Sequence, residues 1–188
     1  MFENLFVIVN FQRLIVLLRI LRSRERRYRW IAYIFGALLP GRREGSGPVA
    51  WLRGCPMPDV RAGRGRIDLG HVGLFPGVRL HCRDTGRISI GDGSYVNRQS
   101  RVFAAREVRI GAHCMIAWDC TITDWAGFDA PSSFAPVWLD DDVWIGCRSV
   151  VLGGTHLGRG CVVAAGSVVQ GDFPPGSILA GVPAKVVS

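Results

Sequence analysis

The hydrophobic residues of the segment 67–188 recur every six residues, an interval that fits neither a helix nor a long alternating strand. The aliphatic positions that keep this interval are Ile90, Val96, Val102, Ile110, Ile116, Ile122, Leu139, Ile145, Val151, Leu157, Val163 and Val169. The fourth residue after each is nearly always small, as in Ser94, Ser100, Cys114, Cys120, Ser149, Thr155, Cys161 and Ser167. Such a repeat suits a short strand followed by a tight turn, and stacked triangular coils of three strands bury a continuous core. The pattern therefore predicts an all-β solenoid over residues 67–188.

The N-terminal residues follow a different pattern. Apolar residues between 4 and 21 recur at helical spacing, which predicts an amphipathic helical segment within residues 1–40. Arg13 and Arg19 interrupt this stretch, and each would cost about 2.5 kcal/mol or more at mid-membrane, which disfavours a true span. Arginines and aromatic residues follow, so we expect a helix at a membrane interface or, alternatively, one packed on the body or on a partner subunit. Residues 41–66 are expected to form a linker and an irregular lead-in.

The positive charge is concentrated in this N-terminal part. The chain of 188 residues has a net charge of +8, of which residues 1–50 contribute nine arginines and three glutamates, a net of +6. No zinc-finger, RRM-like or helix-turn-helix pattern accompanies the charge, and the body is nearly neutral. We therefore expect no nucleic-acid partner.

The repeat also accounts for several of the six cysteines. Cys114, Cys120 and Cys161 occupy the small-residue position, so we expect them to act as small core residues. The chain has no C-x-x-C pair, which favours free thiols and a reducing cytoplasm. Its four histidines have no short spacing that would indicate a metal site, so we expect no metal.

Three stretches resemble the hexapeptide-repeat acyltransferases, which fold as a left-handed parallel β-helix. They are residues 142–146 (Asp-Val-Trp-Ile-Gly), residues 165–169 (Ala-Gly-Ser-Val-Val) and the ending 174–187. The branch that the chain resembles most is that of the sugar O-acetyltransferases, which includes maltose and galactoside acetyltransferases and polysaccharide-modifying enzymes. The resemblance implies a homotrimer whose active sites lie between neighbouring subunits, with acetyl-CoA as the acyl donor and no metal.

The resemblance also implies which residues bind the donor. Gly146, Cys147, Ala165 and Gly166 match positions beside the pantetheine arm of the donor, where main-chain groups make the contacts. Lys185 matches a basic residue near the CoA phosphates, where a cation is physically sensible.

Three further residues match acceptor-site positions of the family. Tyr95 and Trp144 match aromatic residues that border the acceptor, and Asn97 matches an asparagine at the reaction centre. An amide there could stabilise an oxyanion or orient a base. The alternatives are an exposed aromatic for Trp144 and an asparagine stacked at a coil corner for Asn97.

The chain departs from the family at the catalytic base. The family's histidine would stand at Gly127 or Phe128, and no histidine occurs between His113 and His156. One hypothesis is that Asp124 or Asp129 is the base, since a buried carboxylate is a stronger base than one in water.

Three other hypotheses remain open. A histidine from another coil or subunit could supply the base, although His113 and His156 fall outside the core positions and are expected at the surface. The enzyme could work by positioning alone, without a base. The chain could also be a catalytically impaired relative that binds a sugar, CoA or a protein partner.

Residues 124–136 break the repeat before Leu139 restores it. Loops that leave a regular scaffold often carry function. Trp125 and Phe128 in this loop suggest an acceptor pocket in which a sugar stacks on aromatic rings, with a self-packed loop as the alternative. The sequence therefore predicts a CoA-dependent O-acetyltransferase acting on a hydroxyl of a sugar, glycan or glycolipid. We expect it in the cytoplasm, with peripheral contact to the cytoplasmic membrane face through residues 1–40.

Overall fold

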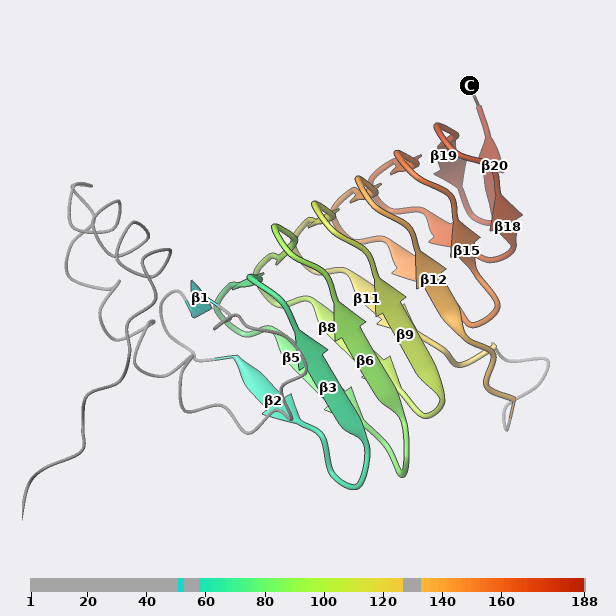
Figure 1. The fold of residues 1–188 in the computed structure, drawn as a ribbon. Helices are drawn as coiled ribbons and strands as arrows, with labels where there is room; N and C mark the ends of the chain where they lie inside the picture. The colour runs from blue at the N-terminus through green and yellow to red at the C-terminus, as the bar shows by residue number, and fades with distance from the viewer. Residues whose placement is uncertain (1–50, 53–57, 127–132, 188) are drawn as a thin grey trace, which may run out of the picture.

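The six-residue repeat folds into short strands separated by tight turns, and three strands complete each turn of a parallel β-helix (Figure 1). The computed structural model describes residues 51–52, 58–126 and 133–187. This confirms the predicted all-β solenoid, while its left-handed sense stays a prediction. The helical segment predicted for residues 1–40 lies outside the described residues.

The strands form three sheets, here called A, B and C, which are the three faces of the β-helix. Sheet A contains, in spatial order, β1 (Trp51–Leu52), β4 (Gly73–Leu74), β7 (Tyr95–Val96), β10 (Met115–Ile116), β13 (Trp144–Ile145), β16 (Val162–Val163), β19 (Ile178–Gly181) and β20 (Ala184–Val186). Sheet B contains β2 (Asp59–Arg61), β5 (Arg79–Cys82), β8 (Arg101–Ala104), β11 (Thr121–Thr123), β14 (Val150–Val151) and β17 (Val168–Val169). Sheet C contains β3 (Arg66–Leu69), β6 (Arg87–Ile90), β9 (Glu107–Ile110), β12 (Val137–Leu139), β15 (His156–Leu157) and β18 (Asp172–Phe173).

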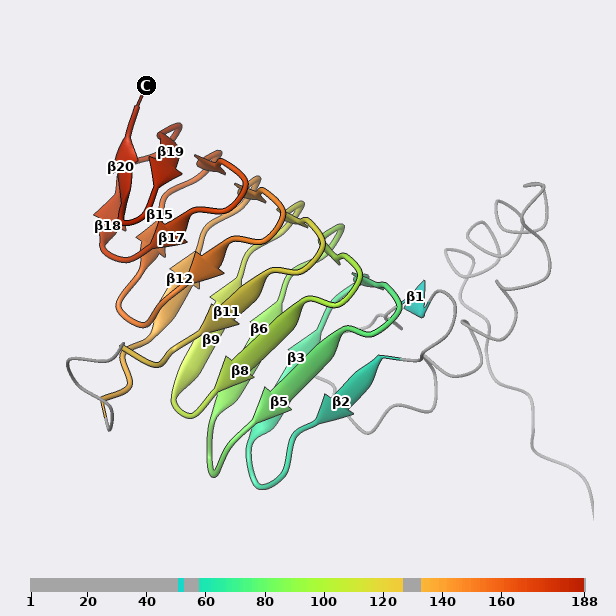
Figure 2. The same cartoon turned by 180° about the vertical axis from the view of Figure 1, so that it is seen from behind.

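The chain passes through sheets A, B and C in turn, so each sheet receives every third strand. Figure 1 looks onto sheet C and Figure 2 onto sheet B. All pairs are parallel except β19 with β20, where the chain turns back at the C-terminal end.

The core is a stack of aliphatic side chains in register from coil to coil. Ile116, for example, is fully buried between Val96 of the preceding coil and Ile145 of the following one. All twelve aliphatic positions that the repeat singles out are buried, which confirms the prediction. Each contributes about 1.5–3 kcal/mol of burial free energy, so the coils support one another.

The turns between sheets A and B form one continuous edge, here called the A/B corner and defined by residues 97–100, 117–120, 146–149 and 164–167. The third residue of each turn has a positive φ, as in Gln99 at 59°, Asp119 at 58°, Arg148 at 58° and Gly166 at 73°. This conformation turns the chain sharply toward sheet B. Because all four turns have the same conformation, residues at equivalent positions of the turns stack in columns along the edge.

The first coil of the β-helix begins N-terminal of residue 67. β1 pairs with β4, and β2 pairs with β5, with Val60 beside Leu80. The lead-in therefore contributes strands to the first coil, although it lacks the six-residue spacing. Within the described part of the chain, no helix is long and apolar enough to cross a membrane.

Candidate functional site

The A/B corner brings together the residues predicted to bind the donor. The N–H of Gly166 donates to the carbonyl of Cys147 at 2.8 Å, and the N–H of Arg148 donates to the carbonyl of Trp118 at 3.0 Å. These bonds place Trp118, Cys147 and Ala165 above one another on successive coils. Gly146 permits this close stacking, because a Cβ atom there would lie 2.6 Å from the nitrogen of Ala165.

Several main-chain donors of this corner remain open, among them those of Cys147 and Ala165. The N–H groups of Cys147 and Ala165 have no hydrogen-bond acceptor within the described part of the chain. Unpaired N–H groups need a partner from solvent or from a ligand. Two N–H groups one coil apart, about 4.8 Å along the axis, can bind the amide carbonyls of an extended ligand lying parallel to the axis.

Asn97 belongs to the same corner, two coils from Cys147 toward the N-terminus. Its side-chain oxygen accepts a hydrogen bond from the N–H of Arg98 at 2.8 Å. This bond leaves the amide nitrogen as a donor without an acceptor among the described residues. Asn97 is therefore oriented to donate a hydrogen bond, which is what stabilising an oxyanion requires.

Tyr95 and Trp144 lie on the outer face of sheet A, beside this corner. Tyr95, Met115 and Trp144 are paired in register on β7, β10 and β13. The row continues through Val162 to Ile178. Trp144 is 48% exposed. The register shows that Tyr95 and Trp144, the two aromatic residues predicted to border the acceptor, belong to one apolar row on sheet A.

Trp118 is a candidate that sequence reasoning missed. It is 51% exposed and stacks in the turn next to Cys147, in the same column as Ala165. One feature of the sequence could have pointed to Trp118: it is an aromatic residue at a turn position at which the neighbouring coils carry smaller or charged side chains.

Lys185 lies at the far end of this path. It belongs to β20, opposite Ala180 of β19, and is exposed. β19 is four strands from β7 in sheet A, which corresponds to about 19 Å along the axis. Asn97, Cys147, Ala165 and Lys185 are thus ordered along one side of the molecule.

Asp124 has a different environment from the one expected of a base. It is 1% exposed, and its carboxylate accepts hydrogen bonds from the N–H groups of Ala105, Arg106 and Glu107 at 2.6–3.1 Å. The carboxylate thereby ties the start of the 124–136 loop to the turn before β9. These contacts favour a structural role, and a catalytic role for Asp124 stays a prediction.

The rest of the loop is partly described. Trp125 and Phe134 form an antiparallel bridge, and the N–H of Gly153 donates to the carbonyl of Trp125 at 2.7 Å. Phe128 and Asp129, two of the predicted site residues, lie outside the described residues.

The two groups of predicted residues lie at different corners of the β-helix. The loop leaves between sheets B and C, opposite sheet A (Figure 2). Strand β11 runs from the A/B corner at Cys120 to Asp124, a span of four residues, or about 13 Å. One chain therefore does not bring Asp124 or Trp125 next to Asn97.

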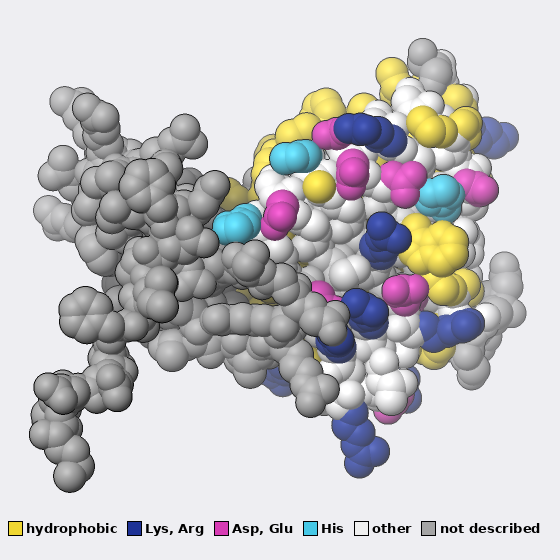
Figure 3. Space-filling view, viewed as in Figure 1, with side chains coloured by type: hydrophobic (Ala, Val, Ile, Leu, Met, Phe, Trp, Pro, Cys, Tyr) yellow, Lys and Arg dark blue, Asp and Glu magenta, His cyan; other side chains and the backbone are white. Residues whose placement is uncertain are grey.

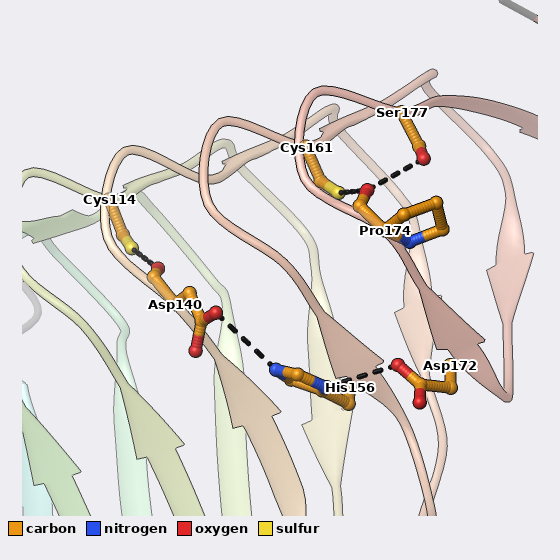
Figure 4. A network of polar contacts seen from close by, with 7 residues as sticks. All are labelled: Cys114, Asp140, His156, Cys161, Asp172, Pro174 and Ser177. Carbon is orange, nitrogen blue, oxygen red and sulfur yellow. Dashed lines mark hydrogen bonds and ion pairs between the residues drawn. The ribbon is translucent and has the colours of Figure 1, made fainter.

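The histidines also lie away from the A/B corner. His156 on sheet C stands between Asp172 at 3.0 Å and Asp140 at 3.4 Å (Figure 4). His113 is exposed in the turn between sheets C and A, which agrees with the expected surface position. Figure 3 shows that the sheet C face carries acidic, basic and histidine side chains intermingled. No group of three metal-ligating side chains occurs within the residues described.

Comparisons with known proteins agree with this geometry. Residues 136–171 match the model of the bacterial transferase hexapeptide (six repeats). A 2,3,4,5-tetrahydropyridine-2,6-dicarboxylate N-acetyltransferase of Staphylococcus aureus (strain JH9) is 40% identical over 82 residues, which are 44% of this chain and 30% of that protein. The chain thus spans less than a third of this curated relative.

Two solved structures show the same fold. A hexapeptide-repeat acetyltransferase from Vibrio cholerae O1 biovar eltor, complexed with acetyl-CoA, is 30% identical, with a TM-score of 0.52 over 58% of this chain and 63% of that one. A variant of AntD, an N-acyltransferase from Bacillus cereus in complex with dTDP-4-amino-4,6-dideoxyglucose and coenzyme A, is 18% identical, with a TM-score of 0.60 over 70% of this chain and 76% of that one.

These matches agree with the fold of the chain. Residues 136–171, which match the bacterial transferase hexapeptide, form part of a parallel β-helix. The structural neighbours of the chain include acetyltransferases.

Proposed function

We propose that this protein transfers an acetyl group from acetyl-CoA to a hydroxyl of a sugar, glycan or glycolipid. The observation that carries the proposal is the pair of open N–H groups at Cys147 and Ala165, in line with the amide donor of Asn97. The 30% identical acetyltransferase complexed with acetyl-CoA supports the choice of donor.

The residues of the A/B corner have distinct tasks in this reaction. The N–H groups of Cys147 and Ala165 donate hydrogen bonds to the amide carbonyls of the pantetheine arm. Lys185 forms an ion pair with the CoA phosphates. The acceptor oxygen attacks the thioester carbonyl, the carbon–sulfur bond breaks, and the hydroxyl proton ends on the CoA thiol. In the tetrahedral intermediate the thioester carbonyl oxygen is negatively charged, and the amide of Asn97 donates a hydrogen bond to it.

A second copy of the chain would complete the site. Sheet A lies opposite the corner that bears the 124–136 loop, so a loop from a neighbouring subunit can cover Tyr95 and Trp144 where its own cannot. A cyclic homotrimer satisfies this arrangement with three identical interfaces. The apolar row of sheet A would then be buried between subunits. Of the two carboxylates predicted as base, Asp129 would then serve in place of the buried Asp124.

One observation favours a second candidate function. Neither a histidine nor an accessible carboxylate other than Asp119 lies at the A/B corner within the described residues, and Asp124 is sealed by main-chain donors. A non-catalytic subunit that binds CoA or a sugar would need no base.

We also propose that residues 1–40 hold the protein on the cytoplasmic face of the membrane. Their net positive charge and apolar periodicity support this placement. Flotation with vesicles that contain anionic lipid tests it, and recovery of all the protein in the lipid-free fraction would contradict it.

The experiment for the main proposal is acetyl-CoA turnover, followed by thiol release, with paired hydroxyl and amino sugars as acceptors. Asn97→Ala should lower kcat by about 100-fold, as the loss of one oxyanion donor does elsewhere, with the Kd of acetyl-CoA unchanged. Gln99→Asn is the matched control, because it keeps an amide in the same turn. Acetyl-CoA binding without turnover on any acceptor would favour the non-catalytic subunit. A preference for amino sugars would replace O-transfer by N-transfer.

A further inference from the structure

Charge is distributed unevenly along the β-helix. Residues 58–110 contain ten arginines and five acidic residues, a net of +5. Residues 111–188 contain three basic and seven acidic residues, a net of −4. The coils up to residue 110, which include Asn97, are therefore basic, and those after residue 110 are acidic.

Four of the ten arginines in residues 58–110 have a carboxylate partner. The pairs are Arg61 with Asp59 at 2.9 Å, Arg66 with Asp68 at 2.7 Å, Arg83 with Asp84 at 3.3 Å, and Arg87 with Asp68 at 3.0 Å. By contrast, Arg79, Arg98 and Arg101 form no ion pair with any described residue, and all three are exposed.

These three arginines lie at the start of sheet B, on the coil of Asn97 and on the coil before it. Arg98 is in the turn directly after Asn97, and Arg101 begins β8 at the end of that turn. Arg79 begins β5 and pairs in register with Arg101, so the two strands place like charges about 4.8 Å apart in the main chain.

Nearby carboxylates do not neutralise this group. Asp59, the register partner of Arg79, already binds Arg61 and His81, and these two contacts lower the pKa of Asp59, with the bond from Arg61 as the larger cause. Asp119 is the single acidic residue in the described turns of the A/B corner. Like charges opposite one another destabilise a sheet, and an anion shared between them reverses that effect.

We propose that Arg79, Arg98 and Arg101 bind a phosphate or diphosphate carried by the acceptor, so that the acceptor is a glycosyl phosphate or diphosphate. This inference rests on the proposed transfer at Asn97. Arg98 and Arg101 belong to the same coil as Asn97, and Arg79 belongs to the coil before it, whereas the proposed donor path runs from Asn97 in the opposite direction, through Cys147 and Ala165 to Lys185. The anion at the arginines therefore belongs to the acceptor and not to CoA.

The test compares the double variant R98Q/R101Q with R64Q/R109Q. The control removes the same charge from two exposed arginines that form no ion pair with described residues and lie away from the A/B corner. Binding of inorganic pyrophosphate at low salt and binding of acetyl-CoA are measured by calorimetry. Turnover is measured with glucose 1-phosphate, with UDP-glucose and with neutral methyl glucoside.

R98Q/R101Q should weaken pyrophosphate binding by about tenfold or more, since two charge-assisted contacts are lost, while the control changes it by less than about twofold. The KM for the phosphorylated acceptors should rise in parallel, and the Kd of acetyl-CoA should stay the same. Retention on phosphatidylglycerol vesicles should fall equally in both double variants, because a membrane surface senses net charge.

Three results would overturn the inference. Equal loss of pyrophosphate binding in both double variants would show a non-specific charge effect. A matching loss of acetyl-CoA binding in R98Q/R101Q would assign the arginines to the donor. A selective loss of vesicle binding in R98Q/R101Q would assign them to a lipid surface. If no acceptor is acetylated but pyrophosphate binding is lost selectively, the anion site stands and the proposed transfer fails.

Discussion

Serine and cysteine are interchangeable in the small-residue position because both donate to the same carbonyl column of the next coil. Ser94 donates to the carbonyl of Gly111 at 2.7 Å, and Cys114, one coil further, donates to the carbonyl of Asp140 at 3.1 Å. Cys161 and Pro174 continue this column (Figure 4). The expected role of these cysteines as small core residues is thus confirmed, and they are buried free thiols.

Burial raises the pKa of Cys114 and of Cys120 to about 11. An unfolded thiol titrates near about 8.5, so the stabilisation is complete below that pH and is lost as the pH rises toward 11. The variant C114S/C120S should lie within about 1–2 kcal/mol of wild type in urea unfolding at pH 7.5. Between pH 8.5 and 11, wild type should lose more stability than the variant, since serine does not ionise. An equal change in the free energy of unfolding of wild type and variant over this pH range would contradict the prediction.

At the scale of elements, one carboxylate anchors the loop that interrupts the coils. Asp124 joins the end of β11 to the turn that precedes β9, and the loop is held further by Gly153, where a Cβ atom would lie 2.2 Å from the carbonyl oxygen of Asp124. The position of the loop therefore depends on the contacts of Asp124 with the main chain of its neighbours, and not on the six-residue repeat.

Asp124→Asn should lower the free energy of unfolding by about 2 kcal/mol, because the new amide N–H₂ would face the N–H donors of the 105–107 turn. Asp119→Asn, at an exposed carboxylate, should change it by less than about 0.5 kcal/mol. Urea unfolding measures both. Unchanged stability combined with a shifted pH–rate profile would instead make Asp124 the base.

The repeat predicted the regular coils, and its interruption predicted the 124–136 loop, whereas the donor-binding residues were expected from the resemblance to the acyltransferases. The aliphatic positions must face inward, and Cys147 and Ala165 become neighbours because one full coil separates them. The sequence did not predict the hydrogen bonds of Asp124 or the place of Trp118 at the A/B corner, for two different reasons. The loop has no period, so no spacing rule connects Asp124 with residue 106, and a turn position leaves the side chain of Trp118 free to be of any type. The strands of the first coil were not predicted because the lead-in lacks the six-residue spacing.

At the scale of the whole molecule, the candidate residues lie on two opposite parts of the β-helix. The A/B corner carries the proposed donor path, and the loop between sheets B and C carries aromatic side chains about 13 Å away across sheet B. A site that uses both requires two subunits, with the apolar row of sheet A between them.

Mixing two impaired variants tests this arrangement. Asn97→Ala and Trp125→Ala should each be nearly inactive, whereas a refolded 1:1 mixture should regain about a quarter of wild-type turnover, because one interface in four combines both intact parts in a cyclic trimer. Light scattering gives the number of subunits. Additive activity in the mixture, or a monomer that turns over at the full rate, would contradict the shared site.

Protection of Cys147 from alkylation by acetyl-CoA tests the central claim most directly, because it needs no acceptor. Cys147 is partly exposed and one of its neighbours on the corner is Ala165, while Cys114, Cys120 and Cys161 are buried. Labelling with a maleimide, followed by peptide mass spectrometry, gives the rate at each thiol. We expect saturating acetyl-CoA to slow labelling of Cys147 by about tenfold or more and to leave the buried thiols unlabelled throughout. An unchanged rate at Cys147 would show that the donor does not bind along the A/B corner.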